Sequence, residues 1–176
     1  WSPYSTGFHD VENFGKVLLA VPPEGNLLQN GDFSGAQEGR FIRPWAADKI
    51  IHRDTEVFLV GGASLRMDKS STWVTCSLRG ILKPDTNYCL SFYLKAEDIA
   101  APGGLAVRLH DGGSRSWKDF PNTPYYGNFT WLRQEMKIRT EKDAGTESHP
   151  PTLAFTFRNG VEGTAWIDKV ELVEVK

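Results

Sequence analysis

The sequence predicts an all-β fold, a two-sheet antiparallel β-sandwich of the jelly-roll type. From Asn26 onward, short segments that alternate apolar and polar residues are separated by turn residues, which is the pattern of half-buried strands. No stretch keeps apolar residues at three- and four-residue spacing over three turns, so helices are not expected. The 176 residues suffice for one ordinary core. We therefore expect one main domain of roughly eight to ten strands.

Several segments alternate clearly enough to be interpreted as strands. The clearest covers residues 88–96, where Leu90 and Phe92 belong to the buried face and Ser91 and Tyr93 to the solvent face. Asn159-Gly160 lies between the last two runs, as a hairpin turn does. The alternating segments are residues 63–67, 72–78, 88–96, 105–111, 131–140, 153–158 and 164–175.

The first 25 residues differ from the rest of the chain. They show no sustained period and end at the Pro22-Pro23 breaker, although residues 16–21 are able to form one strand. We interpret residues 1–25 as the tail of a preceding domain plus a linker, and residues 26–176 as the module. Because the chain begins with Trp1 rather than Met, we expect a mature or excised piece whose export signal would already be gone.

Charge and composition exclude several classes of partner. Lys and Arg total 20 against 22 Asp and Glu, so no basic excess favours nucleic acid or an anionic membrane. No apolar run approaches the roughly 20 residues that span a bilayer. Two cysteines are too few for a structural zinc site. Cys76 and Cys89 either form a disulfide or stay independent thiols, and the alternation slightly favours the second.

The familiar catalytic motifs are absent from the sequence. It contains no Gly-x-Ser-x-Gly elbow, no glycine-rich phosphate loop, no His-Glu-x-x-His pair and no EF-hand loop. The four histidines are dispersed without metal-ligand spacing. Asp111, Asp119 and Glu162 are the only carboxylates we would consider as the acid and base of a small glycosidase or lyase. We therefore expect a protein that is not an enzyme.

Several aromatic residues fall outside the inward-facing phase. Trp73 points outward with Thr75 if Val74 and Cys76 point inward, and Trp117 lies in a polar stretch. Tyr125 and Tyr126 add two rings in a predicted loop. Aromatic faces stack on the apolar face of a sugar ring, so these residues are candidate platforms. In the alternative interpretation, Trp73 and Trp117 cover small clusters under loops. Three other tryptophans are interpreted as packing residues: Trp45, Trp131 and Trp166.

Polar side chains on the same predicted strands are available to bind sugar hydroxyls. Arg108 and His110 lie out of phase with their apolar neighbours, as do Thr156 and Arg158. The two arginines favour an acidic or sulfated glycan, but a neutral xylan or β-glucan fits equally well.

An ordered series of motifs then makes the sequence more specific. It resembles the carbohydrate-binding modules grouped around families 4, 9, 16 and 22, which are often appended to xylanases, glucanases and other polysaccharide-degrading enzymes. The resemblance covers residues 26–176. The motifs are residues 26–33, Trp45, residues 62–67, residues 82–96, Thr130-Trp131 and residues 163–172.

The resemblance implies a jelly roll whose concave sheet carries a glycan cleft. It places Trp73 and Trp117 near the family's cleft aromatics, and Thr156 and Arg158 on the penultimate strand, whose outward residues touch sugar. It also implies a structural calcium ion held by oxygen ligands. The matching positions are Asp32, Ser34, the carbonyl region Gly61–Ala63, and Asp168, with Ser34 standing where many relatives carry Glu.

We therefore predict a non-catalytic carbohydrate-binding module. It would hold a polysaccharide or oligosaccharide and target an attached glycoside hydrolase or lyase to it, in a secreted, periplasmic or cell-surface setting. The alternative is a structural accessory jelly roll that packs on a catalytic domain without its own glycan. Trp73 would then be covered rather than open.

Overall fold

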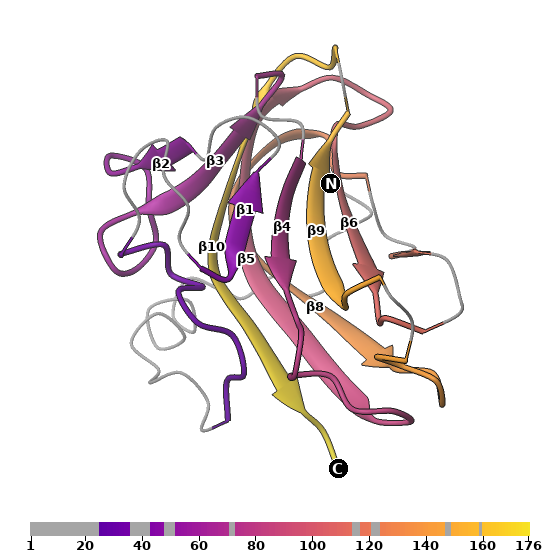
Figure 1. Ribbon diagram of the computed structural model, residues 1–176. Coiled ribbons are helices and arrows are strands. Elements are labelled where there is room, and N and C mark those ends of the chain that lie inside the picture. The colour runs from indigo at the N-terminus through magenta and orange to yellow at the C-terminus, as the bar shows by residue number, and fades with distance from the viewer. Residues whose placement is uncertain are drawn as a thin grey trace.

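The chain forms a sandwich of two antiparallel sheets, which confirms the predicted all-β fold (Figure 1). The computed structural model describes residues 25–35, 43–47, 52–70, 73–113, 117–120, 124–146, 149–158 and 160–176. The proposed linker, except Gly25, and the candidate strand at residues 16–21 lie outside these ranges. The strands are β1 (Trp45–Ala47), β2 (His52–Asp54), β3 (Ser64–Asp68), β4 (Trp73–Ser77), β5 (Asn87–Ile99), β6 (Leu105–His110), β7 (Lys118–Asp119), β8 (Gly127–Arg139), β9 (Thr152–Phe157) and β10 (Thr164–Glu174).

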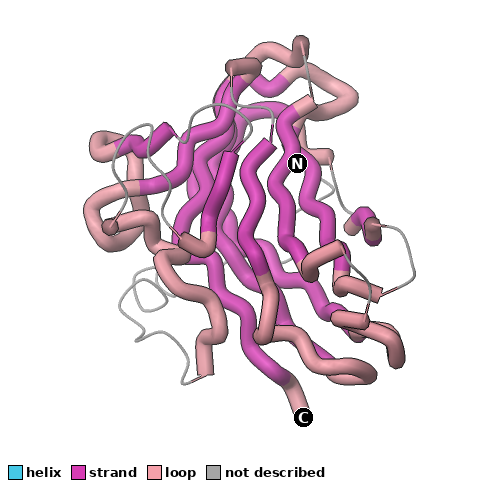
Figure 2. The backbone as a smooth tube through the Cα atoms, in the orientation of Figure 1, coloured by secondary structure: helices cyan, strands magenta, loops and turns pink. Residues whose placement is uncertain are grey.

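Each sheet has five strands. The front sheet in Figure 1 has the order β1-β4-β9-β6-β7, and the back sheet has the order β2-β3-β10-β5-β8. Figure 2 shows only strands and loops along the described residues. Within those residues, no helix has the length and apolar character needed to cross a membrane.

The chain passes between the sheets after β9. Here the hairpin prediction is wrong, because β9 pairs with β4 and β6 while β10 pairs with β3 and β5. Asn159 lies outside the described residues, and Gly160 belongs to a connection between the two layers. Local alternation identifies both strands but does not say which sheet each one joins.

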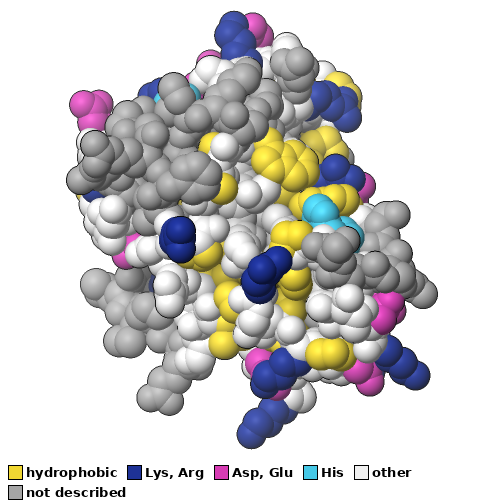
Figure 3. All heavy atoms as spheres, in the orientation of Figure 1, with side chains coloured by type: hydrophobic (Ala, Val, Ile, Leu, Met, Phe, Trp, Pro, Cys, Tyr) yellow, Lys and Arg dark blue, Asp and Glu magenta, His cyan; other side chains and the backbone are white. Residues whose placement is uncertain are grey.

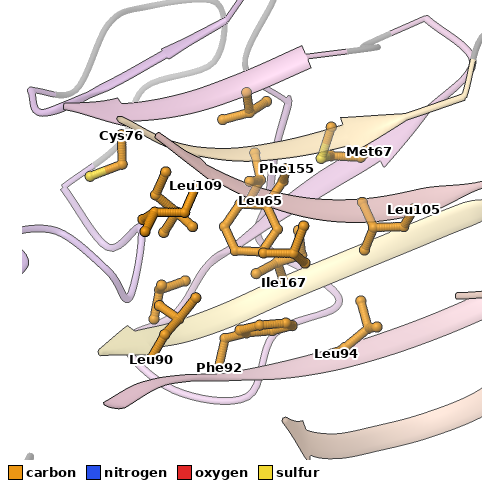
Figure 4. Packing of buried hydrophobic residues seen from close by; sticks show 14 of the residues in the cluster. Leu65, Met67, Cys76, Leu90, Phe92, Leu94, Leu105, Leu109, Phe155 and Ile167 are labelled. Carbon is orange, nitrogen blue, oxygen red and sulfur yellow. The ribbon is translucent and has the colours of Figure 1, made fainter. Parts of the chain in front are cut away.

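The core fills the space between the two sheets (Figure 4). Phe155 of β9 points into this space and packs against Trp45 of β1, with ring centroids 6.2 Å apart, and against Phe92 of β5, at 5.2 Å. Leu90 and Leu94 continue the inward face of β5, as the alternation predicts. The front sheet is therefore fixed to the back sheet through its central strand.

The outward face of β5 differs from the prediction. Ser91 and Tyr93 are buried rather than open to solvent. The register sets Ser91 opposite Glu171 of β10 and Tyr93 opposite Arg133 of β8, and these longer side chains shield the strand between them. The middle of β5 is therefore buried on both faces.

The two cysteines are independent thiols. Cys76 points into the core from β4, where burial raises the pKa of its thiol to about 12. Cys89 lies on β5 in the other sheet and is partly exposed. The sequence left open whether the two cysteines form a disulfide, and the structure shows that both are free thiols.

Candidate functional site

The outward face of the front sheet is built from rows of side chains that cross the strands. Directly paired residues of antiparallel strands point to the same side of a sheet, so the register defines which side chains are neighbours. One row contains Ala46, Thr75, Ala154, Arg108 and Asp119, one residue from each of the five strands. The rows on either side of it contain Trp73, Thr156 and Ala106, and Ser77, Thr152 and His110.

Small side chains occupy the middle of this face. Ala154 and Thr156 of β9 stand between Thr75 of β4 and Ala106 of β6. Ala154 points outward yet has no exposed surface, so neighbouring side chains cover it. We call Thr75, Ala106, Ala154 and Thr156 the floor. Two floor residues, Ala106 and Thr156, line a pocket in which part of a ligand can lie.

Four rings form one cluster beside the floor. Trp73 of β4 meets Trp117, which precedes β7, edge to face, with centroids 5.5 Å apart and planes at 81°. Trp117 also contacts His110 at 5.6 Å and His149 at 5.7 Å, and the two imidazoles are 4.3 Å apart. We call Trp73, Trp117, His110 and His149 the ring cluster. Figure 3 shows hydrophobic side chains gathered around a histidine over β6 and β9, with basic side chains at the margin.

The contacts within the ring cluster hold the indoles in place without a ligand. Both tryptophans are half-buried, so each keeps part of its surface open. Edge-to-face geometry is one of the preferred arrangements of aromatic pairs. Trp73 and Trp117 therefore form one joined surface rather than two separate platforms, and Trp73 is neither fully open nor fully covered.

His110 has a supporting position in this cluster. Only 8% of its surface is exposed, and its Nδ1 accepts a hydrogen bond of 3.0 Å from the N–H of Gly112. Burial lowers the pKa of the imidazole, and the neighbouring His149 adds to that effect. The sequence predicted that His110 would bind sugar hydroxyls, but the structure leaves it little open surface. Its ring instead packs against Trp117. His149 was not predicted, because tertiary contacts alone bring this loop residue here.

A polar pocket of about 350 Å³ adjoins the ring cluster. Arg108 links the pocket to the ring cluster. Its guanidinium pairs with Asp119, which also lines the pocket, and lies 5.7 Å from the centroid of Trp117. Arg158, just after β9, is exposed at the rim. The sequence-predicted residues Arg108, Thr156 and Arg158 thus meet in one place. The lining residues are Gly104, Ala106, Arg108, Asp119, Pro124, Thr156 and Arg158.

The two tyrosines predicted as platforms lie in the packing. Tyr125 is 1% exposed, bridges Leu105 through its backbone and donates a hydrogen bond of 3.2 Å from its hydroxyl to Gln134 Oε1. Burial raises the pKa of this phenol. The prediction for Tyr125 is therefore wrong, because its ring is not available for stacking. Tyr126 is half-buried and packs against the core.

The carboxylates considered for catalysis are held by different partners. Asp111 is buried and accepts hydrogen bonds from the N–H groups of Gly113, at 3.1 Å, and Glu141, at 2.9 Å. Asp119 pairs with Arg108, and the exposed Glu162 pairs with Lys69 at 2.8 Å. Asp111 therefore orders a turn, and the other two are surface ion pairs.

Of the residues predicted to hold calcium, Asp32, Ser34 and Asp168 lie near one another at a second place, beside β10. Asp168 of β10 has no exposed surface, and its Oδ2 accepts hydrogen bonds from the N–H groups of Leu59, at 2.8 Å, and Val60, at 3.0 Å. Burial raises the pKa of Asp168 to about 6, and the charge of Asp32 adds to the effect. The two acidic groups are therefore close enough to repel each other.

Asp32 and Ser34 line a cavity of about 500 Å³ at this second place. Asp32 Oδ1 accepts hydrogen bonds from the backbone N–H of Ser34 at 3.2 Å and from its hydroxyl at 3.0 Å. The backbone of Gly61 closes over Asp32, since a Cβ there would lie 3.0 Å from Asp32 Oδ2. Ala63 is buried and does not line the cavity. The described residues hold no group of three His, Cys, Asp or Glu side chains suited to a metal. A cation here would therefore need backbone or hydroxyl oxygens as well as Asp32 and Asp168.

Comparisons with known proteins support the fold. No protein-family model matches the chain, and no curated protein matches it. Among solved structures, a module described as Family 16 Carbohydrate Binding Module-2 is 16% identical, with a TM-score of 0.61 over 85% of this chain and 100% of its own. The CBM22-1 xylan-binding domain from Paenibacillus barcinonensis Xyn10C is 14% identical, with a TM-score of 0.55 over 75% of this chain and 86% of its own.

A larger enzyme contains a similar fold. An α-L-arabinofuranosidase is 15% identical and matches with a TM-score of 0.59 over 85% of this chain, which corresponds to 26% of the enzyme's length. The chain therefore has the β-sandwich fold seen in carbohydrate-binding modules of families 16 and 22.

Proposed function

We propose that this chain is a non-catalytic carbohydrate-binding module that holds a glycan over the outward face of its front sheet. The observation that carries the proposal is the contact between Trp73 and Trp117 beside a floor of small residues. The half-exposed indoles offer apolar surface to the C–H face of a sugar ring. The fold shared with known carbohydrate-binding modules supports the same conclusion.

The roles of the polar residues follow from their exposure. Thr156 and Arg158 remain accessible at the floor and rim, where they can bind sugar hydroxyls. Arg108 and His110 position Trp117 by packing against it. The site supplies binding surface rather than a reacting pair, since Asp119 is paired with Arg108.

Binding of this kind serves an attached enzyme. A module that holds a polysaccharide raises the concentration of substrate around a linked catalytic domain without taking part in the chemistry. We propose a glycoside hydrolase or lyase as that partner, acting outside the cell, in the periplasm or at the cell surface. The similar fold within the larger arabinofuranosidase supports the arrangement.

The test is retention of the chain by soluble polysaccharides in affinity gel electrophoresis. Each polysaccharide of a panel of xylans, β-glucans, mannans and uronate polymers is cast separately in native gels. Trp117→Ala should lose about 1–3 kcal/mol of binding, by analogy with stacking on other flat ligands. The matched control is Phe58→Ala, which removes an exposed ring from the loop between β2 and β3 of the back sheet.

The outcomes separate the two candidate functions. Retention that Trp117→Ala loses and Phe58→Ala keeps would support the binding module. If no polysaccharide retains the chain, the proposal fails and the structural accessory role takes its place. If circular dichroism shows that Trp117→Ala is unfolded, retention of the more conservative Trp117→Leu variant is measured instead to decide between the two candidate functions.

We also propose that calcium binds between Asp32 and Asp168. Asp32 lines the cavity, its charge helps to raise the pKa of the buried Asp168, and no lysine or arginine is paired to either carboxylate in the described residues, so a hard cation would relieve their repulsion. Binding to the native state alone raises stability by linkage. EDTA should therefore lower the melting temperature by several degrees, and excess Ca²⁺ should restore it. An unchanged melt at matched ionic strength contradicts the proposal.

A further inference from the structure

The pocket beside the ring cluster carries an excess of positive charge. Arg108 and Arg158 bring two guanidinium groups to its lining, and Asp119 brings one carboxylate. The whole chain has a formal charge of -2, so the pocket is opposite in sign to the molecule. A local excess of this kind attracts anions to one place on the surface.

The two arginines differ in what holds them. Arg108 is engaged by Asp119 and by the ring of Trp117. In the part of the chain that the structure describes, no ion pair or side-chain hydrogen bond engages the Arg158 guanidinium. The backbone of Arg158 is nevertheless fixed, because its N–H donates a hydrogen bond of 2.6 Å to the carbonyl of Gly104, another pocket residue. An anchored backbone thus presents an unpaired cation at the rim.

The pocket is continuous with the proposed glycan site. Thr156 lines the pocket and stands directly opposite Trp73 in the register. Arg108 lines it as well and packs on Trp117. The volume of about 350 Å³ is at the lower end of the range for small-molecule sites, which is enough for one sugar unit. A chain lying on the ring cluster would therefore extend into this pocket.

We propose that this pocket receives the carboxylate of a uronic acid unit in an acidic glycan, and that Arg158 is the residue that pairs with it. The inference rests on the proposed function and specifies its substrate class. A guanidinium matches a carboxylate with two parallel N–H···O bonds, a geometry that neutral hydroxyls do not offer. Asp119 does not repel the carboxylate of the ligand, because its own charge is compensated by the paired Arg108.

The test compares one polymer with and without its carboxylates. Glucuronoxylan, polygalacturonate and hyaluronan are each used before and after chemical reduction of the carboxyl groups, with dextran sulfate and dextran as a sulfate arm. For at least one uronate polymer, reduction should weaken binding about tenfold or more, the loss expected for hydrogen bonds to a charged group. Arg158→Gln should weaken binding of the native polymer by a similar factor and weaken binding of the reduced polymer several-fold less, since the Gln amide still donates hydrogen bonds to hydroxyls.

Two further variants make the test specific to this pocket. Asp119→Asn releases Arg108 and should strengthen binding of the native polymer a few-fold relative to the reduced one. Arg79→Gln removes one positive charge from the turn after β4 and should not change the binding of either polymer, so it controls for net charge. Arg158→Gln should fold normally, because the described structure gives its guanidinium no partner.

Each outcome decides between defined alternatives. If native and reduced polymers bind equally, or Arg158→Gln weakens both alike, the uronate assignment is overturned while the proposed glycan-binding function stands. If dextran sulfate alone depends on Arg158, the ligand is a sulfate ester and the carboxylate assignment is overturned. If no polysaccharide binds in any form, the proposed function itself fails.

Discussion

The contact between Trp73 and Trp117 predicts a measurable coupling in stability. Each indole is half-buried, so truncation to alanine should cost about 2 kcal/mol, roughly half the loss for a fully buried aromatic residue. The edge-to-face contact at 5.5 Å is expected to contribute about 0.5–1.5 kcal/mol beyond the area that it buries. Because both single variants lose this one contact, the double variant should cost about 1 kcal/mol less than the sum of the two.

The measurement is a double-mutant cycle from urea denaturation of the wild type, Trp73→Ala, Trp117→Ala and the double variant. Far-ultraviolet circular dichroism is the signal, since the variants remove fluorescent indoles. A second cycle that joins Trp117→Ala with Phe58→Ala, on the other sheet, should be additive within about 0.5 kcal/mol. A coupling below about 0.3 kcal/mol in the first cycle would show that the rings do not form a preorganised surface.

Other predictions concern the core, the buried carboxylate and the thiols. Phe155→Ala removes a ring packed between Trp45 and Phe92 and should lower the free energy of unfolding by about 3–5 kcal/mol, and a loss under 1 kcal/mol in urea denaturation would contradict this packing. Asp168, with its pKa raised from 3.8 to about 6, binds its proton more tightly in the native than in the unfolded state. Its contribution is therefore fully present below about pH 4 and is lost, at about 1.4 kcal/mol per pH unit, as the pH rises to about 6. In EDTA, the free energy of unfolding of the wild type should therefore fall relative to that of Asp168→Ala between about pH 4 and pH 6. A constant difference from pH 4 to 7 would contradict the raised pKa. Cys76, whose thiol pKa is about 12, should resist alkylation in the native protein while Cys89 reacts, as mass mapping of labelled peptides would show.

Much of the architecture follows from local alternation. Leu90, Phe92 and Leu94 occupy one face of β5 because side chains alternate along any strand, and the outward phase of Trp73 follows from the inward phase of Val74 and Cys76 in the same way. These features depend only on neighbours in sequence. They could therefore be predicted before any pairing was known.

The remaining features depend on tertiary contacts that alternation does not encode. Tyr125 joins the core through a single backbone bridge, which is too short to leave a periodic pattern. His149 reaches the ring cluster from a loop, and the shielding of Tyr93 depends on the length of Arg133 on the next strand. Residue type made Trp73 and Trp117 candidates, but only the fold shows that their rings touch.

The most direct test of glycan binding at the front sheet is a titration followed through the indole N–H signals in two-dimensional ¹H–¹⁵N NMR spectra. An oligosaccharide from whichever polymer retains the chain is added, and the six tryptophan signals are assigned by substitution. Our account predicts that the signals of Trp73 and Trp117 shift. Those of Trp45, bonded to the carbonyl of Gln29, and Trp166, bonded to Asp54, should stay in place. Shifts at Trp166 with none at Trp73 or Trp117 would place the ligand on the back sheet and contradict the account.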